Sequence, residues 1–259
     1  MDATERGSRD PLSANAKRGA GAAEPRTGPE LERRRLLIAG LALLPAACAT
    51  PVPMLPPPAL APPLPQVKLG QRWRYETVDL YRGEVVGELR AQVASLDPLV
   101  VALTDARGAP AGEEHWARPW DVLVEPAYDL PQHFETPVPL LPDRLEPGAG
   151  RNDATWYRIP DSSFRLQWRQ QLRAIGWERV RVPAGEFTAL RVQRYINFRH
   201  WDTWREQPWR IDTLWHAPEM GRWVQREWTG EYRWPGRRPV TAYEDRIRWR
   251  LVEWGAGAG

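Results

Sequence analysis

The side chains best suited to chemistry are few, and their spacing matches no common catalytic or metal site. The chain has four histidines and one cysteine. None of the histidines has zinc-ligand spacing, and His200 and His216 would meet only if their strands were neighbours. The run Glu113–His115 could serve as an acid/base cluster, but its polar surroundings favour a solvated run. There is no glycine-rich phosphate loop and no nucleophile elbow. We therefore expect no metal, no cofactor and no enzymatic activity.

Tryptophan is the more informative residue type, because the chain contains fifteen and the first is Trp73. Some fall on positions that alternate with polar residues and are predicted to pack in a core: Trp168, Trp209, Trp215 and Trp249. Others lie in turn-rich sequence beside arginines, and these make a candidate ligand or interface site: Trp116, Trp120, Trp201 and Trp204, with Arg118 and Arg205. Surface tryptophan can contact lipid, sugar or protein, and arginine adds cation–π contacts. Alternatively, these rings fold over the sheet and cover its core.

The only cysteine follows a segment that predicts export. Cys48 comes after three arginines, Arg33–Arg35, and a mostly apolar run, Leu36–Ala47. As a helix that run would span about 18 Å, which is too short for a hydrocarbon core of about 30 Å. It fits the apolar core of a cleavable signal peptide. A single cysteine cannot form an internal disulfide, so its presence in an exported chain needs another explanation.

The end of this segment resembles the lipobox of bacterial lipoprotein signal peptides. Ala46–Cys48 match that motif, and Pro45 stands where leucine is usual. The resemblance implies that Cys48 carries acyl chains such as palmitate, which anchor stably when there are two or three. It also favours the periplasmic face of the outer membrane over the inner membrane, because Ala49 replaces the aspartate that retains such proteins. Arg33–Arg35 allow export by the Sec or the twin-arginine route. An ordinary signal peptide or an uncleaved membrane segment is the alternative.

These features divide the chain into a leader with signal peptide, residues 1–47, a lipidated proline-rich tether, residues 48–66, and one domain, residues 67–259. Prolines favour extended polyproline II in the tether, which at about 3.1 Å per residue would reach roughly 55 Å. The net charge of +3 comes mostly from the leader. Acidic residues alternate with arginines in the domain, so a basic face for nucleic acid is not expected.

Alternation of apolar and polar residues predicts an all-β domain. The runs that carry it are residues 85–93, 164–173, 190–198 and 209–215. Residues 106–152 are rich in proline and glycine and are predicted to be mostly loops, with a strand at 121–125. Residues 164–175 and 243–254 fit either a strand or a helix. We predict a curved antiparallel meander of about ten to twelve strands, with at most one or two short helices.

Two turns in the second half carry a resemblance. Val182–Phe187 and His216–Arg222 have the proline and glycine of hairpin connections. Together they resemble a pattern in an uncharacterised family of Gram-negative envelope lipoproteins, where a VPAG-x-F hairpin precedes a W-x-AP-x-x-G hairpin. Pro137–Gly148 is similar to a stretch upstream of them in that family. The resemblance implies a half-barrel like that of lipoprotein carrier and receptor proteins, and it implies no catalytic residues.

The sequence therefore favours a membrane-anchored periplasmic lipoprotein with a non-catalytic binding or assembly role in the cell envelope. The concave face of a half-barrel could hold an acyl chain or another apolar ligand. One alternative is a structural adaptor for an envelope protein or peptidoglycan. Another is a glycan-processing enzyme, because a pair of carboxylates leaves no sequence motif. The expected partners are the membrane, through Cys48, and a lipid or an envelope protein, with no nucleic acid.

Replacing the cysteine tests the anchor. Cys48→Ala should move the protein from the membrane fraction to the soluble fraction, because the acyl chains have no other attachment point. Cell fractionation with immunoblotting measures this. A variant that stays in the membrane fraction as the wild type does would contradict lipidation at Cys48.

Overall fold

The computed structural model describes residues 53–257, and almost all of its regular structure is β-strand. One 3₁₀ turn, η1 (Pro218–Met220), accompanies the strands. None of the described residues forms a helix long and apolar enough to span a bilayer. The thirteen strands are β1 (Arg72–Asp79), β2 (Glu84–Leu96), β3 (Leu99–Asp105), β4 (Pro110–Arg118), β5 (Asp121–Glu125), β6 (Gln132–Pro139), β7 (Gly150–Arg158), β8 (Leu166–Val182), β9 (Gly185–Phe198), β10 (Glu206–Ala217), β11 (Arg222–Trp234), β12 (Val240–Tyr243) and β13 (Ile247–Gly255).

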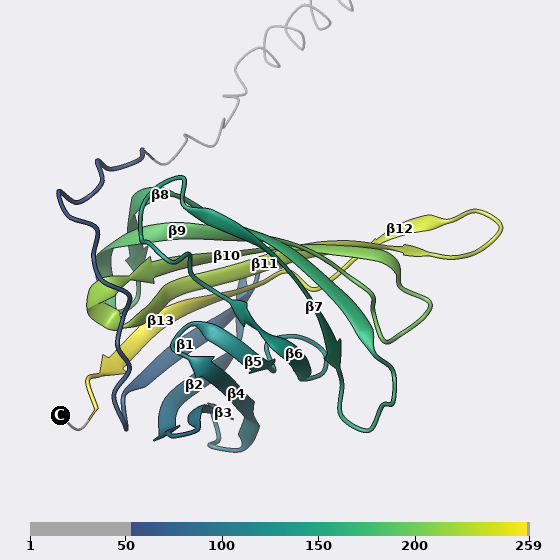
Figure 1. Ribbon diagram of the computed structural model, residues 1–259, viewed down its shortest axis with the longest axis horizontal. Helices are drawn as coiled ribbons and strands as arrows, with labels where there is room; N and C mark the ends of the chain where they lie inside the picture. Colours follow the sequence, from purple (N-terminus) through teal and green to yellow (C-terminus); the bar gives the residue numbers. More distant parts are fainter. Residues whose placement is uncertain (1–52, 258–259) are drawn as a thin grey trace, which may run out of the picture. The chain divides into compact units, whose positions relative to one another are not determined.

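The strands form one antiparallel sheet that closes on itself (Figure 1). Neighbours along the chain pair from β1 to β11, β13 pairs with β1 and β11, and the β10–β11 ladder closes the ring. The predicted all-β antiparallel meander is confirmed, but the predicted half-barrel is wrong, because twelve strands make a closed barrel and β12 extends β11 beside it. Closure removes the two unpaired edges that an open sheet would expose.

Strand β9 shows how the sequence produces this sheet. Leu190, Val192, Ile196 and Phe198 are all buried, as their alternation predicts. The same parity includes Arg194, which is fully buried. A charged residue therefore occupies a core position in an otherwise apolar row.

Strand β10 reverses the predicted core face. Trp209 and Ile211 are only half-buried, whereas Arg210 and Asp212 are buried. The expectation that apolar residues face the core fails at these positions, because Arg210 and Asp212 point inward and pair with other charges inside the barrel. Trp168, Trp215 and Trp249 are buried as predicted.

Several other expectations are corrected or confirmed. The region 106–152 is not mostly loop: it contains β4, β5, β6 and the start of β7, although the strand at 121–125 was expected. Pro110 and Pro139 stand at strand ends, where a missing N–H costs little, whereas Pro137 lies within β6. The two predicted hairpin turns connect β8 to β9 and β10 to β11. Residues 164–175 and 243–254 contain strand and no helix.

Antiparallel order sorts the connections between strands into two ends of the barrel. We call one the distal end, with connections 80–83, 106–109, 126–131, 159–165, 199–205, 235–239 and 244–246. The other is the proximal end, with connections 97–98, 119–120, 140–149, 183–184 and 218–221. Residues 53–66, which we call the strap, meet the proximal end: Leu55 donates its N–H to Trp177 O at 2.7 Å, and Trp120 Nε1 donates to Pro65 O at 3.2 Å. In Figure 1 the β11–β12 hairpin lies far from the strap.

A buried histidine near the proximal end gives the fold a pH dependence. His216 is 1% exposed, and its ring meets the edge of Trp120 at 5.3 Å. Burial lowers the pKa of His216 to about 3, whereas an unfolded histidine titrates near 6.5. Between these values the unfolded chain binds a proton that the folded chain does not, so stability falls as the pH falls.

Replacing this ring with an apolar one should weaken that dependence. For His216→Phe we expect a smaller loss of unfolding free energy between pH 7 and about pH 4 than in the wild type. Urea unfolding followed by circular dichroism at both pH values measures it. The exposed His115, changed to Phe, is the control. An equal loss in His216→Phe and wild type would show that this histidine is not the cause.

Candidate functional site

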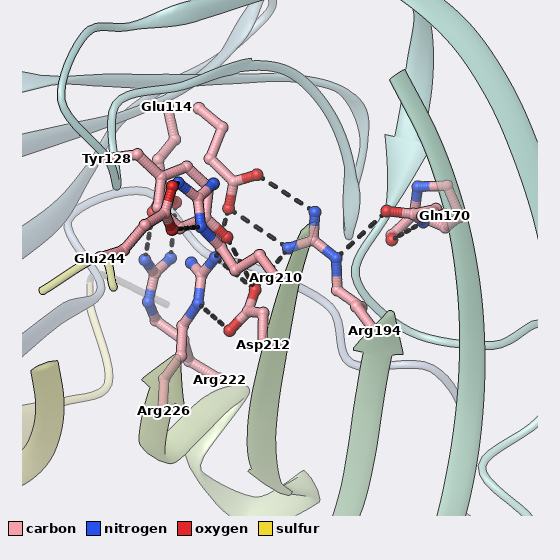
Figure 2. A network of polar contacts seen from close by, with 11 residues as sticks. Glu114, Tyr128, Gln170, Arg194, Arg210, Asp212, Arg222, Arg226 and Glu244 are labelled. Atoms are coloured by element: carbon pink, nitrogen blue, oxygen red, sulfur yellow. Dashed lines mark hydrogen bonds and ion pairs between the residues drawn. The ribbon is translucent and has the colours of Figure 1, made fainter. Parts of the chain in front are cut away.

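Four charged side chains meet inside the barrel and form what we call the central cluster (Figure 2). Arg194 Nη1 lies 2.8 Å from Asp212 Oδ2, and Arg226 Nη2 lies 2.7 Å from the same oxygen. Both guanidinium groups also bind Glu125, with Arg194 Nη2 at 3.2 Å from Glu125 Oε2. All four side chains are 0–1% exposed. Two cations and two anions are therefore removed from water together.

The sheet register explains how these residues meet. Asp212 and Arg194 are directly opposed on β10 and β9, and Arg226 points inward from β11, the other neighbour of β10. Glu125 is the last residue of β5 and reaches the cluster from a strand that pairs with none of these three. The cluster therefore joins separate parts of the barrel wall.

Further groups complete the hydrogen bonds of the cluster. Arg194 Nε donates to Gln170 Oε1, whose amide nitrogen donates to Pro139 O. The Tyr128 hydroxyl donates to Asp212 Oδ2 at 3.2 Å. Burial raises the pKa of Tyr128. Burial alone would also raise the pKa of Glu125, but Arg194 and Arg226 lower it to about 2. Glu125 is therefore ionised at neutral pH and unsuited to act as a general acid.

Two more buried ion pairs lie on either side of the central cluster. Arg210 is bound by both oxygens of Glu244, at 2.7 and 2.9 Å, and Arg222 by both oxygens of Glu114, at 2.6 and 2.9 Å. Each of these arginines is bound bidentately by its carboxylate, which is a strong ion-pair geometry. The expectation that the Glu113–His115 run is solvated is wrong for Glu114, which is 4% exposed.

One of these pairs forms part of a groove at the distal end, which we call the distal groove. Its volume is about 370 Å³. Its aromatic lining consists of Tyr128, Trp228, Tyr232 and Tyr243. Its charged lining includes two ion pairs, Arg210–Glu244 and Arg205–Asp129, the second at 3.1 Å. The guanidinium of Arg210 lies 3.5 Å above the ring of Tyr128. The groove is therefore amphipathic rather than apolar.

Exposed aromatic rings surround this end of the barrel. Those on the distal connections and adjoining strand ends are Tyr81, Phe164, Trp201, Trp204, Trp234 and Tyr243. Trp204 and Trp234 come from different hairpins and stack at 6.3 Å. Within residues 53–257, the distal arginines without an ion pair to another described residue are Arg107, Arg199, Arg233, Arg237, Arg238 and Arg246. Aromatic rings and free guanidinium groups thus gather at the end opposite the strap.

The structure separates the six residues proposed from the sequence. Trp116 and Trp120 are each 2% exposed and pack together at 5.0 Å between their centroids. Burial of this pair agrees with the alternative interpretation, in which the rings cover the core of the sheet, rather than with a ligand or interface site. Arg118 is exposed beside them and pairs with Asp121.

The other three proposed residues lie together at the distal end. Trp201 and Trp204 are 40% and 58% exposed. Arg205 lies 5.0 Å above the ring of Tyr232 and pairs with Asp129. His200 is also distal, whereas His216 is at the other end of β10, so the two do not converge. Within residues 53–257 no group of histidine, cysteine and carboxylate side chains has the arrangement of a metal site. Cys48 lies outside the described residues.

The sequence matches no protein-family model and no curated protein. Two solved structures resemble the fold. One is a candidate exported protein of Bacteroides fragilis with a YmcC-like fold, 14% identical, with a TM-score of 0.46, covering 76% of this chain and 100% of that one. The other is a candidate lipoprotein of Parabacteroides distasonis, 15% identical, with a TM-score of 0.47 and the same coverage. The likeness is one of fold, and no residue role is transferred from it.

Breaking the central cluster should destabilise the barrel. Arg226→Met leaves Glu125 and Asp212 buried with one cation, and loss of one partner of a buried pair costs about 3–5 kcal/mol. Chemical unfolding followed by tryptophan fluorescence measures the unfolding free energy. The control is Arg165→Met, which removes an exposed pair with Glu135 and should cost no more than about 1 kcal/mol. Equal losses in the two variants would contradict a structural role for the cluster.

Proposed function

We propose that this protein is a lipid-anchored, non-catalytic adaptor of the cell envelope that binds an envelope protein through its distal end. The observation that carries the proposal is that exposed aromatic rings, and arginines without an ion pair to another described residue, lie at the distal end of the barrel, where the distal groove also opens. The anchor at Cys48 and its place on the periplasmic face of the outer membrane are parts of the same proposal, based on the lipobox resemblance.

The composition of the distal end supports a protein partner. Tryptophan, tyrosine and arginine are enriched in protein interfaces and in the few residues that dominate their binding energy. Trp204 and Trp234 offer large, stacked apolar surfaces at this end. Arg237 and Arg238 on the β11–β12 hairpin form no ion pair with another described residue and can bind carboxylates of a partner bidentately. Peptidoglycan is the other envelope polymer that these rings could contact, and the experiment below separates the two.

An acyl chain inside the barrel has less support. The interior positions that a carrier would leave open hold the central cluster and two further ion pairs. A buried hydrocarbon chain would keep water away from these charged groups and would offer them no hydrogen bonds in its place. A glycan-processing enzyme also has less support, because two of the three groove carboxylates, Asp129 and Glu244, are bound by arginine, which leaves Asp245 as the one without an ion pair to another described residue. A hydrogen bond from His200, with the charge of Arg205, lowers the pKa of Asp129.

Site-specific photo-crosslinking in living cells tests the proposal. A photoreactive phenylalanine analogue replaces Trp204 in one strain and Trp234 in another. The matched control replaces Tyr195, which is exposed on the wall of the barrel at β9. We expect both distal positions to crosslink to one and the same envelope protein, identified by mass spectrometry, and the wall position not to.

Two results would contradict the proposal. Crosslinked products that collapse after muramidase digestion would identify peptidoglycan as the partner. No product above the Tyr195 control at either distal position would show that the distal end binds neither.

Trp204→Ala with Trp234→Ala should abolish the product formed from a probe at Tyr243, which lies in the groove.

A further inference from the structure

The strap is exposed over most of its length and carries no charged side chain. No charged residue occurs from Ala49 to Val67, in a chain that is 27% charged. Three large apolar side chains of the strap are exposed: Met54, Leu60 and Leu64, the second at 85%. Apolar side chains that project from a segment without charges are suited to an apolar or interfacial environment.

The strap is fixed to the barrel near its start. Hydrogen bonds from β7 and the segment just before it reach β8 only as far as Ala174, so the edge of β8 beyond Ala174 is open to the strap. Leu55 uses this edge: its N–H donates to Trp177 O at 2.7 Å, and its side chain packs against the core. A Cβ at Gly176 would stand 2.7 Å from Met54 Sδ, so the glycine permits this close approach.

A second attachment holds the end of the strap. Pro65 is buried, and its carbonyl accepts the indole N–H of Trp120 at 3.2 Å. Between the two attachments the residues are mostly exposed. The strap therefore lies along the proximal end and turns apolar side chains away from the barrel.

The first attachment shortens the reach of the anchor. Only seven peptide units separate Cys48 from Leu55, which span at most about 25 Å when extended. A free tether from Cys48 to residue 66 would reach roughly 55 Å. At the same end Lys68 is exposed, has no ion pair to another described residue and can meet a headgroup phosphate. Arg144 and Arg181 are also exposed, but they pair with Glu146 and Glu186 at 3.7 and 3.8 Å.

We propose that the strap is a membrane-docking surface, and that the proximal end of the barrel lies on the bilayer that holds Cys48. This rests on the lipidation proposed above. Leu60 and Leu64 of the strap enter the interface, Lys68 meets a lipid phosphate, and the distal end faces away from the membrane.

Headgroup quenching in vesicles tests the orientation. Full-length lipidated protein is reconstituted in phosphatidylethanolamine–phosphatidylglycerol vesicles that contain a headgroup nitroxide lipid. The only free thiol is an engineered cysteine that carries an environment-sensitive fluorophore, at Leu60→Cys or at Arg238→Cys. We expect at least a twofold loss of fluorescence at position 60 and no loss at position 238. Equal quenching, or stronger quenching at 238, would overturn the proposal.

Loss of the first attachment provides a second test. Leu55→Pro removes the N–H that donates to Trp177 O. The chain between Cys48 and the barrel is then fixed only at Pro65, so the barrel can lie farther from the bilayer. A fluorophore at Leu96→Cys, on the proximal end, should be quenched in the parent protein and much less so with Leu55→Pro. Leu60→Pro, which removes no backbone hydrogen bond of the described structure, is the control and should keep the quenching. Unchanged quenching in Leu55→Pro would overturn the role of the first attachment.

The mass of the Cys48 peptide separates the two possible failures. An unmodified peptide contradicts the lipid anchor itself. A lipidated peptide together with an unquenched position 60 contradicts only the docking of the strap.

Discussion

The central cluster is the interaction on which the rest of this structure depends. Arg194, Asp212 and Arg226 lie on three adjacent strands, and Glu125 joins them from β5. Two guanidinium groups and two carboxylates can remain buried only while all of them stay paired. The sheet must therefore close around the cluster, and the interior is then filled by polar pairs and aromatic rings rather than left open for a ligand.

The two ends differ because the meander sends successive connections in opposite directions. The proximal end receives the strap, whose Leu55 extends the sheet at β8. The distal end carries Trp204, Trp234 and the distal groove, with arginines that have no partner in the described chain. In the proposed orientation, this one short attachment gives the domain a membrane-facing end and an end available to a partner.

Sequence reasoning predicted local structure well and long-range structure poorly. The alternation through β9 and the proline–glycine turns before β9 and after β10 are local signals, and the structure confirms them. Closure depends on the pairing of β13 with β1 and with β11, which no local pattern specifies. The buried Arg194 could have been noticed as a charge at an apolar position, but its partner Glu125 lies far away in the sequence. Trp120 looked exposed because a turn surrounds it, although the fold buries it.

Neutron reflectometry of the lipidated, full-length protein on a supported bilayer tests the orientation of the domain most directly. It measures the water-filled distance between the lipid headgroups and the first protein density. The attachment of Leu55 to Trp177 predicts protein density that begins at the headgroups, with no separate water layer. A hydrated gap of tens of ångströms, approaching the roughly 55 Å of a free proline-rich tether, would contradict the account.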